Sequence, residues 1–176
     1  EMIEVGCMNR FLNAPALYPH LKGQQTDLFK CIITNSLDLQ SPYGYMGLIH
    51  PNEIFDDVKG QALRLHIFPR LLFKFQYQNT FLLFSEVEHK KIFNSVIYKG
   101  TNNKEINFDS INNVFHPNTI DACYSHDGSG ICEGKEIVNE QGRRVPNIKG
   151  HSHRIIHYDK SQLQFISSIF EEDAEW

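Results

Sequence analysis

The pattern that most constrains the fold is an amphipathic helix followed closely by a short apolar strand. From Thr26 to Leu39, apolar side chains recur at helical spacing, with Thr26 or a neighbour as the cap. The turn Ser41-Pro42-Tyr43-Gly44 ends this helix. Tyr45 to His50 then has the character of a strand that ends at Pro51, because proline lacks the donor for a ladder hydrogen bond. A strand reached from a helix through so short a turn predicts an α/β layer with a parallel sheet.

A second helix and a hairpin are predicted next. The helix runs from Gln61 to Phe73, and Pro69 inside it predicts a kink or two short pieces. The aromatic run from Phe75 to Phe84 and the run from Ile92 to Tyr98 predict an antiparallel hairpin. A charged loop from Ser85 to Lys91 joins its two strands.

The two ends of the chain give weaker signals. Residues 1–24 are expected to be irregular, and residues 101–150 are rich in Asn, Gly, Asp and Ser around one apolar island, Ile111-Val114-Phe115. Arg154 to Tyr158 is a candidate strand. Asp159 is expected to cap a last helix that carries Leu163, Ile166, Ile169 and Phe170 at helical spacing.

Composition predicts a globular protein without a membrane-spanning segment. The chain has 176 residues, 41% hydrophobic and 22% charged, which fits one domain. No apolar run approaches the roughly 18 residues of a membrane span, and the start does not resemble a signal peptide. With no export signal, the four cysteines are expected to be reduced thiols of a cytoplasmic protein. The net charge of −4 comes from the tail Glu171-Glu172-Asp173-Ala174-Glu175, so it says little about binding to nucleic acid.

Two candidate metal sites are weighed against simpler interpretations. Cys123 and Cys132 with His151 and His153 are zinc-type ligands, but their spacing fits no standard finger, so surface thiols and an exposed histidine pair are favoured. A small Mg²⁺-dependent nuclease is an alternative function, with carboxylates holding the metal and a lysine polarising the water. Its residues are Asp57, Glu86, Glu88 and Lys90, although charges at a hairpin tip are usually just solvated.

Two further patterns lie in the loop-rich region. His126, Asp127 and Ser129 are of the types found in catalytic triads, but Gly128 and Gly130 beside them favour a simple turn. Four basic residues are possible phosphate contacts, namely Arg143, Arg144, Lys149 and Arg154. Three glutamates just upstream weaken that interpretation. No Gly-rich nucleotide-binding loop is present.

Several stretches together are distinctive. They are Tyr18-Pro19-His20-Leu21-Lys22-Gly23-Gln24-Gln25-Thr26-Asp27-Leu28-Phe29-Lys30-Cys31, Gly47-Leu48-Ile49-His50-Pro51-Asn52-Glu53-Ile54-Phe55-Asp56-Asp57-Val58-Lys59-Gly60, Phe75-Gln76-Tyr77-Gln78-Asn79 and Phe115-His116-Pro117-Asn118-Thr119-Ile120-Asp121-Ala122-Cys123. They resemble the C-terminal part of the methylase domain of large bacterial restriction-modification DNA adenine methyltransferases (type IIG-like). The segment from His126-Asp127-Gly128 to His151-Ser152-His153-Arg154-Ile155 is similar to a later region of the same family. The resemblance covers nearly all of residues 18–170.

The resemblance implies a partial Rossmann-like methyltransferase sheet, built as helix, strand, helix and β-hairpin. Residues 1–100 would be the second half of that α/β domain, and residues 101–176 a loop-rich extension with a short strand and a C-terminal helix. The family holds S-adenosylmethionine in a Gly-rich turn and acts through Asn-Pro-Pro-Tyr, and this chain contains neither motif. It departs from the family pattern also at Asp27 and Val58, where the family has Asn and Pro. No catalytic residue and no bound cofactor are therefore expected in this chain alone, which should not methylate DNA, whereas the intact parent enzyme would use S-adenosylmethionine.

The resemblance also suggests which residues face the substrate. Ligands of open α/β sheets bind beyond the carboxyl ends of strands, where His50 and Asn52 lie. The complete set of candidate substrate- or DNA-facing residues is Lys22, Gln24, Gln25, His50, Asn52, Asp56, Asp57 and Lys59. The implied partners are DNA, bound through the full-length protein, and the missing N-terminal half of the methylase domain. A non-catalytic interaction domain is the remaining alternative.

Overall fold

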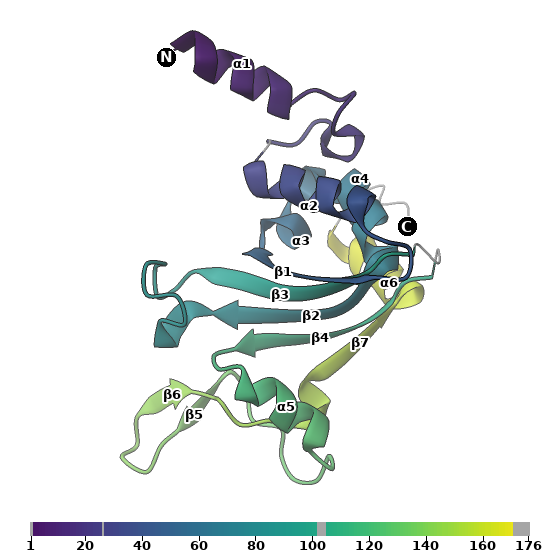
Figure 1. The fold of residues 1–176 in the computed structure, drawn as a ribbon. Coiled ribbons are helices and arrows are strands. Elements are labelled where there is room, and N and C mark those ends of the chain that lie inside the picture. The colour runs from purple at the N-terminus through teal and green to yellow at the C-terminus, as the bar shows by residue number, and fades with distance from the viewer. Residues whose placement is uncertain (1, 26, 102–104, 171–176) are drawn as a thin grey trace.

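The computed structural model describes residues 2–25, 27–101 and 105–170 (Figure 1). Its helices are α1 (Met2–Leu12), α2 (Leu28–Leu39), α3 (Glu53–Asp56), α4 (Gln61–Ile67), α5 (Asn118–Ser125) and α6 (Lys160–Phe170). Its strands are β1 (Tyr45–Pro51), β2 (Leu71–Gln78), β3 (Ile92–Lys99), β4 (Asn107–Val114), β5 (Glu136–Val138), β6 (Arg144–Pro146) and β7 (Ile155–Asp159). The predicted cap Thr26 and the acidic tail lie outside the described residues.

Five strands form one mixed sheet in the order β1-β3-β2-β4-β7, and β5 and β6 form a separate antiparallel hairpin. β3 is antiparallel to both β1 and β2, β4 is parallel to β2, and β7 is antiparallel to β4. The predicted parallel sheet is therefore wrong. Among the described strands, only β2 and β4 are parallel neighbours, because β3 turns back from β2 and lies between β2 and β1. The predicted antiparallel hairpin, β2 with β3, is confirmed.

This topology gives β1, β2 and β4 the same direction, so their carboxyl ends lie at the same end of the sheet. Strands β4 and β7, which come from the region after residue 100, extend the sheet that β1 to β3 begin (Figure 1). No described helix is both long enough and apolar enough to cross a membrane.

Apolar side chains cover both faces of the sheet, because successive residues of a strand point to opposite sides. On one face, α2, α4 and α6 pack against the strands through buried side chains that include Leu37, Leu63, Tyr98 and Leu163. On the other face, α5 places the buried Cys123 in a smaller cluster of strand residues. Figure 1 shows α2 and α4 above the strands and α5 below them.

The predicted helix from Gln61 to Phe73 ends earlier than expected. α4 stops at Ile67, Phe68–Arg70 form a 3-10 turn with Pro69 near its start, and β2 begins at Leu71. Pro69 has no N–H to continue the α-helical ladder, so the chain leaves the helix there and becomes extended soon after.

The predicted strand from Phe75 to Phe84 is correspondingly displaced. It occupies Leu71–Gln78, and Asn79–Phe81 form a 3-10 turn. The Asn79 side chain holds the connection by donating to the carbonyls of Phe84 (2.9 Å) and Val87 (2.7 Å).

Two regions expected to be irregular contain regular structure. α1 occupies much of residues 1–24 and stands apart from the sheet in Figure 1. β4 and α5 occupy part of the polar region after residue 100. The polar side chains of β4 hid its alternation, although Phe108 and Ile111 are buried on opposite faces.

Four other predicted secondary-structure elements are confirmed. α2 and β1 lie where the opening pattern placed them. β7 and α6 close the described chain, and the Gln162 backbone N–H donates to Asp159 Oδ1 (2.8 Å) at the start of α6, which is the expected cap.

Candidate functional site

His50 lies near the carboxyl end of β1 and is buried, between the rings of Phe29 and Phe55. Its Nδ1 lies 2.7 Å from the Pro51 carbonyl oxygen, so Nδ1 carries the proton and donates it. Its Nε2 is then an acceptor, 3.5 Å from the Tyr98 hydroxyl. Burial lowers the pKa of His50, and the nearby Lys74 lowers it further, against the opposing Pro51 bond and Glu53 charge. His50 is therefore a neutral side chain that fixes the end of the strand.

Asn52 follows β1 and links three elements. Its Oδ1 accepts from Gln76 Nε2 of β2 (3.1 Å) and from Asn94 Nδ2 of β3 (2.9 Å). Its Nδ2 donates to Asp56 of α3. This side chain holds the carboxyl ends of β1 and β2 at a fixed distance and orients the Asp56 carboxylate.

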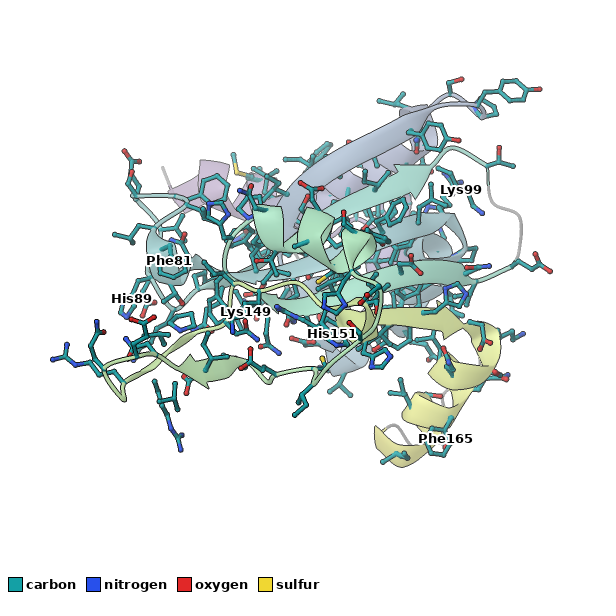
Figure 2. The ribbon with its side chains drawn as sticks, turned by 90° about the horizontal axis from the view of Figure 1, so that it is seen from below. Phe81, His89, Lys99, Lys149, His151 and Phe165 are labelled. Carbon is teal, nitrogen blue, oxygen red and sulfur yellow. The ribbon has the colours of Figure 1, made fainter. Side chains whose placement is uncertain are left out.

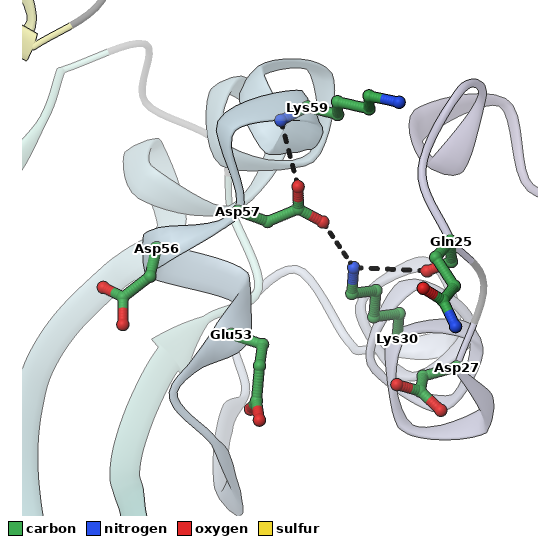
Figure 3. Close-up of a pocket in the computed structure, with 7 residues that line it drawn as sticks. All are labelled: Gln25, Asp27, Lys30, Glu53, Asp56, Asp57 and Lys59. Atoms are coloured by element: carbon green, nitrogen blue, oxygen red, sulfur yellow. Dashed lines mark hydrogen bonds and ion pairs between the residues drawn. The ribbon is translucent and has the colours of Figure 1, made fainter.

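Lys30 and Asp57 form the electrostatic centre of the site. Lys30 Nζ of α2 lies 2.7 Å from Asp57 Oδ2, and the lysine side chain is only 4% exposed. The same ammonium group donates to Gln24 Oε1 (3.2 Å) and to the Gln25 carbonyl (3.4 Å). Figure 3 shows Lys30 reaching across from α2 to the Asp57 carboxylate.

Asp57 is held ionised by its surroundings. Burial by itself would raise the pKa of Asp57. Hydrogen bonds from Lys30 and from the Lys59 backbone N–H (3.0 Å), with the charges of Lys30 and Arg64, outweigh that effect and lower it. Asp57 is thus an anion that caps the 3-10 turn Val58–Gly60 and pairs with α2.

A cavity of about 480 Å³ lies beside this pair (Figure 3). It is lined by Gln25, Asp27, Lys30, Glu53, Asp56, Asp57 and Lys59. Four carboxylates and two ammonium groups give this cavity many acceptors and few donors, which suits a ligand that presents amino groups.

Lys74 of β2 is a further polar group near these residues. Its Nζ lies 5.0 Å from the centre of the Phe55 ring and donates to Asn112 Oδ1 (3.2 Å). Burial lowers the pKa of Lys74 to about 8, although the negative charge of Asp56 opposes the shift.

The structure brings together only some of the predicted site residues. Gln25, Asp56, Asp57 and Lys59 line the same cavity. Gln24, by contrast, is buried and its amide bonds to the His20 carbonyl (3.1 Å) and to Lys30, so its side chain serves the fold. His50 and Asn52 are also buried, and Lys22 lies outside the lining of the cavity.

The four residues of the nuclease alternative do not line one common cavity. Asp57 lies in the cavity described above, Glu86 lines a hollow with Glu88 in the β2–β3 connection, and Lys90 lines another with Glu88. Within the part of the chain that the structure describes, no three His, Cys, Asp or Glu side chains are grouped to hold a metal ion. The two cysteines of the zinc candidate differ in exposure, because Cys123 is buried in α5 and Cys132 is exposed.

The triad candidates form a turn. Asp127 Oδ1 accepts from the Ser129 hydroxyl (2.6 Å) and backbone N–H (2.9 Å), and the His126 Nδ1 accepts from the Gly128 N–H (2.9 Å). Of the four possible phosphate contacts, Lys149 and Arg154 line one cavity with His126 and His151, whereas Arg143 and Arg144 lie at the β5–β6 hairpin outside its lining.

Lys30, Gln76 and Asn94 are important residues that were absent from the predicted site. A signal for Lys30 was available, because it shares a helical face with Ile33 and Leu37, and a lysine on an apolar face needs a buried partner. Gln76 and Asn94 gave no such signal, because their convergence on Asn52 depends on the strand order.

No model of a known protein family matches this chain, and no curated protein matches it.

Proposed function

We propose that this chain is the part of a restriction-modification DNA adenine methyltransferase that follows its catalytic motif. The whole enzyme would transfer a methyl group from S-adenosylmethionine to the exocyclic amine of adenine. This part would form one wall of the pocket for the flipped base and contribute to the DNA-facing side. The residues assigned to that wall are Gln25, Asp56, Asp57 and Lys59, with Lys22 toward the DNA.

The arrangement of β1, β2 and β3 is the observation that carries this proposal. The chain passes from α2 to β1, through α4 to β2, and returns as β3. β3 lies antiparallel between β1 and β2, which leaves those two strands pointing the same way. The sequence resemblance implies the order helix, strand, helix and hairpin. In the structure, the β2–β3 hairpin joins the same sheet as β1.

The free edge of β1 supports the proposed partner. Among the described residues, β1 pairs only with β3, and Tyr45 and Ile49 on this strand are 76% and 60% exposed. Leu28 and Ile32, one turn apart on α2, are exposed as well. An open strand edge beside exposed apolar side chains suits another layer of the same α/β domain, the half that would carry the Gly-rich turn and Asn-Pro-Pro-Tyr.

The acceptor-rich cavity supports the proposed substrate. It lies just beyond the carboxyl end of β1, where open α/β sheets bind their ligands. The hydrogen bonds of Asn52 and the Lys30–Asp57 pair hold its walls in place. A rigid wall of acceptors can orient an adenine amine without supplying the catalytic groups.

DNA binding by the chain tests the proposal. Fluorescence anisotropy with a labelled DNA duplex at low salt should detect weak binding, and Lys22→Gln and Lys59→Gln should each weaken it and reduce the salt dependence by about one counterion. Lys99→Gln is the matched control, because Lys99 lies at the opposite end of the sheet (Figure 2). Equal losses in all three variants, or no binding at low salt, would contradict the proposal.

Cofactor binding tests the other half of the proposal. Isothermal titration of the chain with S-adenosylmethionine should show no heat of binding, since the Gly-rich turn is missing. Micromolar affinity would overturn the assignment of this chain to the region after the catalytic motif.

A further inference from the structure

A second cavity lies on the far side of the sheet from α2, between the loops of residues 126–133 and 147–154. Its volume is about 190 Å³, and His126, Lys149, His151 and Arg154 are among the residues that line it. Figure 2 shows Lys149 and His151 on the stretch of chain that runs beside α5. A water molecule takes about 30 Å³ in the liquid, so this cavity has room for a phosphate-sized group.

His151, one of the residues that line this cavity, carries a buried hydrogen-bond donor without a partner among the described residues. The His151 residue is 5% exposed, and its ring Nδ1 accepts the His153 backbone N–H (3.1 Å). An imidazole whose Nδ1 is an acceptor carries its proton on Nε2. That Nε2 is buried and has no hydrogen-bond partner among the described residues. A buried N–H without a partner is unfavourable, so a ligand that accepts from it is stabilised.

His126 repeats the same arrangement. Its Nδ1 accepts the Gly128 N–H (2.9 Å), so its proton also lies on Nε2. The approach of Nδ1 to Asp127 Oδ1 at 3.7 Å is therefore not an ion pair. The His126 and His151 rings stack with their centroids 4.2 Å apart. Two neighbouring imidazoles of the lining thus both carry their proton on Nε2.

The charge of the lining favours an anion. Lys149 and Arg154 are positive, and Glu133 is the acidic residue of the lining. Glu133 is already neutralised by Lys149, whose Nζ lies 3.1 Å from its Oε2. The Arg154 guanidinium donates to the carbonyls of Lys149 (2.6 Å) and Asn113 (3.0 Å), which leaves its positive charge without a carboxylate in the lining.

The walls of the cavity are held before any ligand arrives. Asn147 is buried, donates to the Gly134 carbonyl (2.8 Å) and accepts the Lys149 N–H (2.9 Å). Thr119 of α5 donates to the Ile148 carbonyl (2.9 Å). A cavity whose donors are fixed in this way loses little conformational freedom when it binds.

We infer that this cavity binds a phosphate group, which the Nε2–H donors of His126 and His151 hold beside the positive charge of Arg154. The group can be free inorganic phosphate or a phosphodiester of a DNA backbone, because both present the same oxygens. The inference does not depend on the methyltransferase proposal, since it concerns a separate cavity and a different ligand.

Histidine resonances in NMR spectra test this inference. Inorganic phosphate added to the full chain at constant ionic strength should shift the ring signals of His126 and His151 saturably, while those of His89 stay unchanged. His126→Asn and His151→Asn should each weaken the affinity about tenfold. In these variants the asparagine oxygen replaces Nδ1 as the acceptor for the backbone N–H, so only the Nε2–H donor is lost.

His116→Asn is the matched control. His116 Nδ1 also accepts a backbone N–H two residues on, from Asn118 (3.3 Å), but His116 does not line the cavity. Its variant should bind phosphate as the wild type does. A short DNA duplex used in place of phosphate distinguishes the two sources: shifts of the same two histidines identify a backbone phosphodiester, and shifts with inorganic phosphate alone identify a free anion. No saturable shift with either probe, or an equal loss in His116→Asn, would overturn the inference.

Discussion

The Lys30 ammonium nitrogen lies 2.7 Å from the Asp57 carboxylate and ties α2 to the loop that follows β1. Because Lys30 is almost fully buried, its charge has no access to water if the partner is lost. We expect Asp57→Asn to lower the free energy of unfolding by about 2–3 kcal/mol, as measured by urea denaturation. Lys91→Met removes the exposed pair with Glu53 (3.2 Å) and should cost at most about 0.5 kcal/mol. Equal losses of stability in the two variants would show that the buried pair stabilises the fold no more than the exposed pair does.

The Asp57 carboxylate makes the stability of the protein depend on pH in the acid range. The pKa of Asp57 is lower in the folded protein than in the unfolded chain, so its contribution is complete above the unfolded value of about 3.9. The contribution disappears as the pH falls through the lower, folded value. The stability difference between wild type and Asp57→Asn should therefore be constant from about pH 5 to 7 and shrink below about pH 4. A difference that stays constant at lower pH would contradict the lowered pKa.

His66 of α4 should produce a second dependence at higher pH. Burial lowers its pKa to about 4, helped by the nearby charges of His20 and Arg70, while Asp38 opposes the shift. Between about pH 6.5 and 4 the unfolded chain therefore binds more protons, and stability falls as the pH falls. We expect a loss of at most about 1.4 kcal/mol per pH unit in this window, and His66→Gln should flatten it. His89→Gln, in an exposed loop, should leave the profile unchanged.

Asn52 should be one of the most sensitive positions outside the apolar core. Asn52→Ala leaves the amide groups of Gln76 and Asn94 without their acceptor, and Asn94 is fully buried. The expected loss is about 2–3 kcal/mol in urea denaturation. Asn107→Ala, on an exposed position of β4, should change the stability by less than about 0.5 kcal/mol. A small effect at both positions would mean that water replaces the Asn52 acceptor.

Gly150 sets the distance between the second cavity and α5. A Cβ atom at Gly150 would lie only 2.2 Å from the Ala122 backbone carbon, so Gly150→Ala must push the loop away from α5. We expect a loss of at least about 2 kcal/mol, together with altered NMR signals of His151. Gly134→Ala adds a methyl group where nothing lies within 4 Å and should be nearly neutral. Unchanged His151 signals in Gly150→Ala would contradict this packing.

An element could be predicted from the sequence where its own residues show a clear apolar spacing or a capping residue. α2, β1 and α6 were predictable because their apolar spacing or their cap lies within the element. β4 was not, since buried Ser110 and surrounding Asn and Asp residues mask its alternation. The direction of the strands was also beyond local pattern, because nothing between residues 45 and 99 determines that β3 inserts beside β1.

The candidate site shows the same limit. Asp56, Asp57 and Lys59 were found from their place after β1, and they do line a cavity. The ion-pair partner of Asp57 is Lys30, which lies on a helix 27 residues earlier in the chain. Gln24, which lies ahead of the first helix, is among the predicted substrate- or DNA-facing residues, although its amide is buried against Lys30. Polarity alone does not distinguish a side chain that contacts a ligand from one that satisfies a buried charge.

Within the part of the chain that the structure describes, β1 is an edge strand, and this has a consequence for the behaviour of the protein in solution. Tyr45–Pro51 contains no lysine, aspartate or glutamate, and its proline is the last residue of the strand. Charges, prolines and bulges are what normally prevent strand edges of two molecules from pairing. A concentrated sample of this chain is therefore prone to edge-to-edge aggregation, and a polypeptide that covers β1 would act as its solubilising subunit.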